Sequence, residues 1–239
     1  MTRKYRIYPM PIVKLLLDKG TFTYLNFYGE KIWATSYSFY IEGADKNILV
    51  DTAVSAGDWK RNRPIQAEDI VTFEESLLKF GLKPLDIDIV IATHLHLDHF
   101  FNSRKCRNAK VIVQEDELRF TYNPRPPFSQ HYSQEFYKGI NFKTVKGDTE
   151  ITSGVRVILT PGHTAGSQSV SIDTEKGRAV ITGFCSLDEN FDEKGYMVPG
   201  IHFDPFKAYE SMVKVKSISD ILIPLHSQRL VDQNIKSIP

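Results

Sequence analysis

The segment His94-Leu95-His96-Leu97-Asp98-His99 carries four metal-ligand side chains within six positions. It directly follows an apolar run, residues 89–92, whose length and composition are typical of a buried β-strand. Imidazole and carboxylate groups at this density suit zinc or a similar divalent ion. The alternative interpretation is a solvated polar loop, which has no need of so many ligand-type residues. The segment therefore predicts a metal site at the end of a strand.

Other predicted strands also end in ligand-type residues. Residues 48–50, 155–159, 179–181 and 221–223 are apolar runs, and they are followed by Asp51, His163, Cys185 and His226. Five of the seven histidines in the chain thus lie just past a strand end. Because loops at strand ends bring residues distant in sequence into one site, we expect these residues to converge. We expect Asp51 to orient a metal-bound histidine rather than to bind the metal itself.

Three of these residues also have a purely structural interpretation. His163 follows Pro161-Gly162 and can cap the turn or helix that comes next. His226 can be a hydrogen-bonded histidine at a sheet edge, and Asp51 can be a turn aspartate. The neighbouring ligand-rich segment favours metal binding for the two histidines.

The remaining elements indicate a mixed α/β chain without strict alternation. Residues 33–41 and 48–50 predict a hairpin around a turn at residues 43–46. Apolar positions that step by three and four predict a helix over residues 68–80. Asp204-Pro205 is typical of a helix start, and that helix is expected to end near Ile218. No linker or repeat is evident, so residues 1–239 are expected to form a single domain.

Composition excludes several classes of protein. The chain has 30 Lys and Arg against 29 Asp and Glu, a net charge of +1, so we expect no nucleic-acid partner. No apolar run approaches the ~20 residues that cross a bilayer, so we expect no membrane partner. The N-terminal segment carries positive charge but no secretion signal that we can identify. With only two cysteines, the chain is consistent with a reducing, cytoplasmic location, and its near-neutral charge is consistent with a small-molecule substrate.

The motifs together resemble those of the metallo-β-lactamase superfamily. They occur in order from about residue 48 to 226: Asp51-Thr52, the His-x-His-x-Asp-His block, Pro-Gly-His-Thr at His163, Thr182-Gly183, and His226. The resemblance implies an αββα sandwich of two mixed sheets flanked by helices, with the site at one edge. It also implies that His94, His96 and His163 bind one metal ion, and that Asp98, His99 and His226 bind a second. Zinc is the expected metal, with iron, cobalt or manganese as alternatives.

The chain departs from the superfamily pattern at one ligand position. Most members with two metals carry a bridging aspartate directly after Thr-Gly, whereas this chain has Phe184 and then Cys185. Cys185 is either a thiolate ligand of the second metal, as a cysteine is in the β-lactamase branch, or a small buried residue. Cys106 lies outside every motif and is expected to be inert.

The resemblance implies metal-dependent hydrolysis, in which a metal-bound hydroxide attacks a lactone or a related carboxylic ester. Asp98 is the expected catalytic residue, which holds a metal and orients the hydroxide. Several stretches, including residues 160–169 and 199–205, look most like the acyl-homoserine lactonase branch. Where that branch places a substrate-contacting tyrosine, this chain has Leu187. Candidate replacements are His131, Tyr132, Tyr196 and His202.

Other functions within the superfamily remain open at this point. One is thioester cleavage of the glyoxalase II type. Another is oxidation by a single iron, as in persulfide dioxygenases. A third is a binding module without turnover, although such a module would not need Asp98 and His99 together. We expect the substrate pocket near the aromatic segments 24–28 and 124–137, which also make a homodimer a reasonable expectation.

Overall fold

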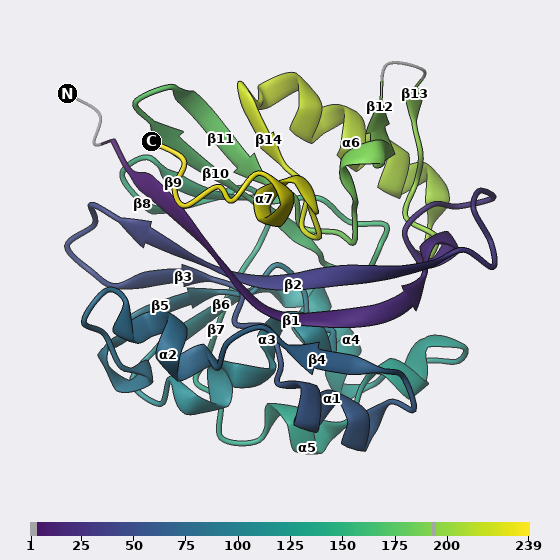
Figure 1. The fold of residues 1–239 in the computed structure, drawn as a ribbon, viewed down its shortest axis with the longest axis horizontal. Helices are drawn as coiled ribbons and strands as arrows, with labels where there is room; N and C mark the ends of the chain where they lie inside the picture. Colours follow the sequence, from purple (N-terminus) through teal and green to yellow (C-terminus); the bar gives the residue numbers. More distant parts are fainter. Residues whose placement is uncertain (1–3, 193–194) are drawn as a thin grey trace.

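Two β-sheets pack face to face in the computed structural model, which describes residues 4–192 and 195–239 (Figure 1). The first sheet has seven strands in the order β4-β1-β2-β3-β5-β6-β7: β1 (Arg6–Asp18), β2 (Lys31–Glu42), β3 (Ile48–Val50), β4 (Ala67–Asp69), β5 (Ile89–Ile91), β6 (Lys110–Gln114) and β7 (Phe142–Val145). The second has five in the order β14-β11-β10-β9-β8: β8 (Thr149–Thr152), β9 (Val155–Leu159), β10 (Gln168–Thr174), β11 (Gly177–Ile181) and β14 (Ile221–Ile223). Two further short strands, β12 (Phe191–Asp192) and β13 (Gly195–Tyr196), pair antiparallel with each other. Residues 1–3, the start of the N-terminal segment in which no secretion signal is expected, lie outside the described residues.

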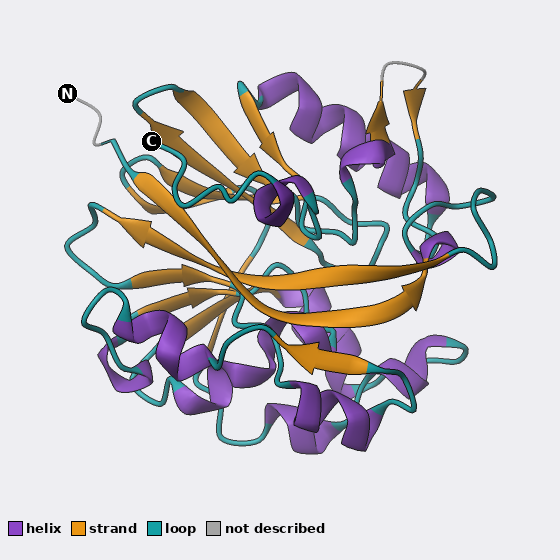
Figure 2. Cartoon of the chain, viewed as in Figure 1, coloured by secondary structure: helices purple, strands orange, loops and turns teal. Residues whose placement is uncertain are grey.

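Most of the helices lie on the outer faces of the two sheets (Figure 2), whereas the last one places Leu230 in the core between the sheets. They are α1 (Ala56–Asn62), α2 (Phe73–Leu78), α3 (Leu97–Phe100), α4 (Glu115–Tyr122), α5 (Gln134–Tyr137), α6 (Pro205–Ile218) and α7 (Arg229–Asp232). Helix α6 packs Met212 and Val215 against Val180 on the second sheet, and α2 packs Phe73 and Leu77 against the first. No helix within the described residues is long and apolar enough to cross a membrane.

The main hydrophobic core lies between the sheets and explains why they stack. Alternate residues of β2, β3 and β5, such as Phe39, Val50 and Ile91, meet Val157 and Ile172 from the second sheet, and all five are fully buried. Their neighbours on the other face of the same strands form separate cores with the helices. This two-sided burial is typical of sheets covered on both faces. The expected αββα sandwich is confirmed.

The elements predicted from the sequence are present in the structure, but the start of one helix is misplaced. The predicted hairpin is confirmed, with Phe39 opposite Val50. The Asp204 carboxylate accepts hydrogen bonds from two backbone amides of α6, which ends at Ile218 as expected. The predicted helix over residues 68–80 is wrong at its start, because Thr72 forms a capping box with Glu75 and helix α2 begins at Phe73. Glu68 and Asp69 belong instead to strand β4, which pairs with β1, and residues 70–72 form the connection to the helix.

Strand direction brings the ligand-type residues to one edge of the sandwich. Strands β3, β5 and β6 are parallel neighbours, and β11 and β14 are also parallel. Parallel strands end at the same edge of a sheet, so the segments after β3 and β5 lie side by side. The backbone amide of Thr93 donates to the carboxylate of Asp51 at 2.7 Å, which fixes this neighbourhood.

Candidate metal centre

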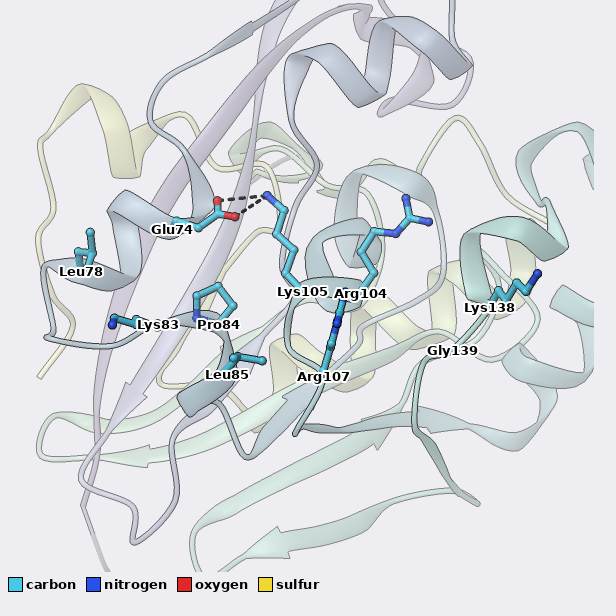
Figure 3. A pocket seen from close by; sticks show the side chains of 10 residues that line it. All are labelled: Glu74, Leu78, Lys83, Pro84, Leu85, Arg104, Lys105, Arg107, Lys138 and Gly139. Carbon is cyan, nitrogen blue, oxygen red and sulfur yellow. Dashed lines mark hydrogen bonds and ion pairs between the residues drawn. The ribbon is translucent and has the colours of Figure 1, made fainter.

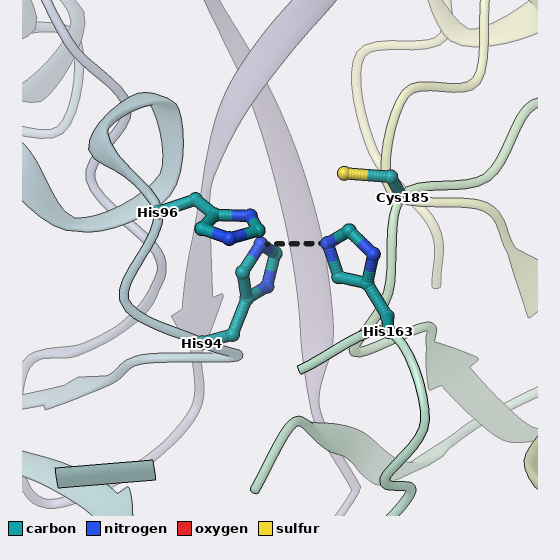
Figure 4. A group of neighbouring side chains, drawn as sticks. All are labelled: His94, His96, His163 and Cys185. Carbon is teal, nitrogen blue, oxygen red and sulfur yellow. Dashed lines mark hydrogen bonds between the residues drawn. The ribbon is translucent and has the colours of Figure 1, made fainter. Parts of the chain in front are cut away.

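Three histidines and a cysteine lie close together at the edge of the sandwich where the ligand-bearing strands end. The ligand atoms of His94, His96, His163 and Cys185 all lie within 4.8 Å of one another, and all four residues are buried. His94 and His96 follow β5, His163 follows β9, and Cys185 follows β11. Figure 4 shows the three imidazole rings gathered together with the cysteine sulfur directed toward them. The expected convergence of strand-end residues is present in the fold.

A second group of ligand atoms lies beside the first. The ligand atoms of His99, Cys185 and His226 also lie within 4.8 Å of one another. The Asp98 carboxylate adjoins this group, with Oδ2 at 3.3 Å from His99 Nε2 and 3.9 Å from His226 Nε2. The predicted histidine ligands therefore divide between two adjoining groups, Cys185 belongs to both, and Asp98 lies beside the second.

Hydrogen bonds on the outer side of three rings fix their orientation. His99 Nδ1 donates to Asp51 Oδ2 at 3.1 Å, and His226 Nδ1 donates to the carbonyl oxygen of Thr35 at 2.9 Å. His163 Nδ1 donates to the carbonyl oxygen of Ile201. Each of these bonds leaves the Nε2 atom of its ring turned toward the cluster, which is the usual arrangement around protein-bound metals. Asp51 therefore contacts a ligand-type histidine, as its predicted orienting role requires.

The donor atoms fit divalent ions. Zinc binds imidazole nitrogen at about 2.0–2.1 Å, so two ligands of one tetrahedral ion lie about 3.4 Å apart. The 3.3 Å between His94 Nε2 and His163 Nε2 agrees with this separation. His226 Nε2 is buried and has no hydrogen-bond partner among the described residues. A buried polar atom without a partner is costly, and a metal ion in contact with it would remove that cost.

Burial keeps most of these imidazoles neutral at neutral pH. It lowers the pKa of His94 and His96 well below the ordinary value, and that of His163 to about 3. His99 differs, because the neighbouring carboxylates of Asp98 and Asp51 outweigh burial and raise its pKa. Burial raises the pKa of Asp98, but the positive charge on His99 outweighs it, and the net shift is downward. Apart from His99, which must release a proton before it can bind a cation, the cluster thus offers neutral nitrogens and an ionised carboxylate, the forms that bind cations.

Two positions at which the chain departs from the family pattern, Phe184 and Leu187, lie in apolar parts of the core. Phe184 packs with Met212 and Val215 of α6, on the side away from the ligands. Leu187 packs with Phe22 and Cys185, so no hydroxyl replaces the missing tyrosine there. In the segment that directly follows β11, residues 182–187, Cys185 is grouped with the ligand histidines.

A cavity of about 320 Å³ opens directly onto the ligands. Three of its lining residues, His96, Asp98 and Cys185, belong to the cluster. The other lining residues come from several separate parts of the chain and are mostly apolar: Leu17, Thr21, Phe22, Trp59, Arg63, Pro64, Ile65, Leu97, Gln130, His131 and Ile201. The cavity therefore provides a largely apolar binding space whose floor is the ligand cluster.

The four predicted substrate residues occupy different places. His131 lines the cavity, and the Tyr132 hydroxyl lies 3.4 Å from His96 Nε2. Tyr196 packs instead against Phe191 and Tyr209. His202 donates from Nδ1 to the carbonyl oxygen of Pro199, and its ring lies against Tyr24. Neither Tyr196 nor His202 is part of the cavity lining.

A larger cavity, of about 1020 Å³, lies elsewhere on the surface (Figure 3). Its charged lining is mostly basic: Lys83, Arg104, Lys105, Arg107 and Lys138, with Glu74 bonded to Lys105. It shares no lining residue with the cavity at the ligands. The larger of these two cavities therefore does not contact the ligand cluster, whereas the smaller one does.

Sequence reasoning missed Glu117, which joins two ligand-bearing loops. Its carboxylate accepts from the backbone amide of Leu95 and from that of Gly166, each at 3.0 Å. Leu95 lies between two ligand histidines, and Gly166 follows His163. A Cβ atom on Gly166 would lie 2.4 Å from the backbone of Glu117, so the contact requires glycine. The acidic run at residues 115–117 resembles a solvated helix face, and no sequence signal set Glu117 apart.

Comparison with known proteins agrees with this geometry. The family model described as "Metallo-beta-lactamase superfamily" matches residues 32–216. The N-acyl homoserine lactonase of Bacillus cereus is 29% identical over 238 residues, covering 89% of this chain and 88% of that protein. An AiiA variant from B. thuringiensis, crystallised with N-decanoyl-L-homoserine at its active site, superposes with a TM-score of 0.81 at 27% identity. That alignment covers 98% of this chain and 97% of the other.

A further solved structure has the same fold. It is an N-acyl homoserine lactone hydrolase with N-hexanoyl-L-homoserine bound at its catalytic metal centre, with a TM-score of 0.82 at 26% identity. The alignment covers 98% of this chain and 97% of that chain. The expected likeness to the acyl-homoserine lactonase branch is confirmed by these relatives. The matched family model and the shared fold show that the chain belongs to the metallo-beta-lactamase superfamily.

Proposed function

We propose that this protein is a metal-dependent hydrolase that opens lactones or related carboxylic esters, with N-acyl-homoserine lactones as the first substrates to test. One observation carries the proposal: Asp98 adjoins the second ligand group and also lines the cavity. A carboxylate in that place contacts both the ligand cluster and whatever the cavity holds. The lactonase relatives support the substrate class.

The ligand set fits two divalent ions, with zinc as the proposed metal. His94, His96 and His163 would hold one ion, and Asp98, His99 and His226 the other. Such ions lower the pKa of a bound water toward ~7 and polarise a carbonyl group. Asp98, an ionised carboxylate, would accept a hydrogen bond from the attacking water and so orient it toward the substrate carbonyl. The apolar cavity lining would bind the acyl chain.

His131 is the proposed hydrogen-bond donor to the substrate. Arg63 donates to His131 Nδ1 at 3.2 Å, and a guanidinium cannot accept, so neutral His131 carries its hydrogen on Nε2. Burial and the charge of Arg63 both lower the pKa of His131, which favours this neutral form. The residue lines the cavity, whereas Leu187, at the position of the tyrosine of the lactonase branch, is apolar core and provides no donor. We propose that its Nε2–H binds a substrate oxygen.

Replacement of Asp98 by asparagine tests the proposal. Proton release from a long-chain acyl-homoserine lactone would be measured with zinc- or cobalt-loaded protein. We expect Asp98→Asn to lower kcat by about 100-fold or more while metal is still bound, because the amide cannot replace the carboxylate as an acceptor. Asp116→Asn, on the exposed face of α4, is the matched control and should keep full activity. Full activity of Asp98→Asn would refute the mechanism.

The second ligand group favours hydrolysis over oxidation by a single iron. Mono-iron oxygenases of this superfamily need only two histidines and an aspartate, whereas His99 and His226 here add a further set of ligand atoms. Thioester cleavage would use the same groups, and a thioester substrate in the same assay distinguishes it. Turnover of a thioester with no lactone opening would reassign the substrate class.

A further inference from the structure

The sulfur of Cys185 lies between the two groups of ligand histidines. It is within 4.8 Å of the ligand atoms of His94, His96 and His163, and within 4.8 Å of those of His99 and His226. Its distance to His99 Nε2 is 4.0 Å. Two nitrogen ligands of one zinc ion are about 3.4 Å apart. A zinc–thiolate bond, at about 2.3 Å, is longer than a zinc–imidazole bond, at about 2.0–2.1 Å, so a sulfur ligand can lie somewhat farther from the nitrogen ligands. The sulfur is thus close enough to both groups to contact an ion in each.

A second observation shows that this space is built for a cation. His226 Nε2 is fully buried, faces Asp98 and Cys185, and has no hydrogen-bond partner among the described residues. The aspartate that bridges two metals in most relatives is missing, and Phe184 at that position packs into the α6 core. An acidic bridge is therefore absent while a cysteine sulfur lies within reach of both groups.

We propose that Cys185 bridges the two metal ions through its sulfur and replaces the missing carboxylate. The inference rests on the dinuclear centre proposed above. On metal binding the S–H bond breaks, the proton leaves to solvent, and the sulfur forms one bond to each ion, with no change in oxidation state. Thiolate is a softer ligand than carboxylate, so the bridge favours zinc, cobalt or cadmium over manganese or magnesium.

X-ray absorption spectroscopy at the zinc edge counts the sulfur directly. The experiment uses the intact protein loaded with two zinc ions per chain. A bridging cysteine contributes about one sulfur neighbour per zinc, because each ion contacts the same atom. A cysteine bound to one ion gives an average of about half a sulfur per zinc, and a cysteine that binds neither gives none. The two lower values, or a protein that binds only one zinc, overturn the bridge.

The other cysteine provides a matched control. Cys106 is buried in a separate core, against Leu95 and Phe100, so Cys106→Ser should leave the zinc–sulfur signal unchanged. Cys185→Ser should abolish it, and Cys185→Asp should abolish it while two zinc ions are retained. Loss of the signal in Cys106→Ser but not in Cys185→Ser would contradict the assignment.

The same preparations separate this inference from the proposed function. Lactone opening is measured on each sample whose sulfur count is known. About one sulfur per zinc without lactone opening would leave the bridge correct and the proposed substrate wrong. Lactone opening with no zinc–sulfur contact would leave the function correct and the bridge wrong.

Discussion

The ligand cluster and the cavity wall beside it are built from different kinds of segment. Each histidine of the ligand cluster follows a strand of one of the two sheets and is buried. Three of them also have a hydrogen bond that orients the ring. Much of the wall comes from loops and short turns, including the 3₁₀ turn Phe128–His131, and Arg63 and His131 are only partly buried. The sheets therefore hold the ligand side chains in position, whereas the loops that form the wall can vary and so determine which substrate fits.

The largest expected effect on metal affinity comes from Asp51, which lies beside the ligand cluster. Its Oδ1 accepts from the Thr93 amide, while Oδ2 accepts from the Thr93 hydroxyl and from His99 Nδ1. Asp51→Asn leaves one acceptor oxygen where two are used, so His99 loses its orientation or Thr93 loses a partner. We expect metal affinity to fall by about 10- to 100-fold, measured by competition with a chromophoric chelator. Unchanged affinity would show that the outer hydrogen bonds do not preorganise the cluster.

The sequence predicted this region well because its signal is local. Ligand-type residues concentrated after apolar runs, as at His94 and His163, follow from strand ends that share one edge. The division of ligands between two ions came from family resemblance, since spacing does not encode which loops meet. Thr72 shows the limit of periodicity: its capping box, not the apolar spacing, determines where helix α2 begins.

The wall was less predictable because its residues gain their role only in three dimensions. Trp59 lies on α1, and nothing in the sequence near it indicates that it contacts a cavity with His131. Tyr196 and His202 are candidates from the sequence because they are aromatic or imidazole side chains near motifs, but the chain path directs them toward Tyr209 and Tyr24. Local patterns contain little information about how such loops fold back.

A pH-dependent cost is expected of His163 in the metal-free protein. Burial lowers its pKa from 6.5 to about 3, so below pH 6.5 the unfolded chain binds a proton that the folded protein excludes. Stability therefore falls as pH decreases through this window. Relative to His163→Gln, wild type should lose on the order of 1 kcal/mol of unfolding free energy between about pH 7.5 and about pH 5.5. Urea denaturation at both pH values measures it, and a difference that stays constant would mean that folded His163 is freely protonated.

The smallest expected effect concerns a donor in the wall. Trp59 is buried, lines the cavity, and its Nε1 has no hydrogen-bond partner within the described part of the chain. A buried N–H without a partner next to a binding cavity is suited to an oxygen of the ligand, such as the amide oxygen of an acyl chain. Trp59→Phe removes the donor and keeps an aromatic wall, so KM should rise about threefold to tenfold for amide-containing lactones, with kcat little changed.

Simple alkyl lactones, which lack the amide, provide the control for that variant. If Trp59 acts as a donor, their KM should change much less than that of the acyl-homoserine lactones. An equal increase for both substrates would mean that Trp59 acts only by filling space. Either result sharpens the contrast with Asp51, because a change in the wall should alter substrate preference and leave metal affinity unaffected. A loss of metal in Trp59→Phe would instead show that the wall and the ligand cluster depend on each other.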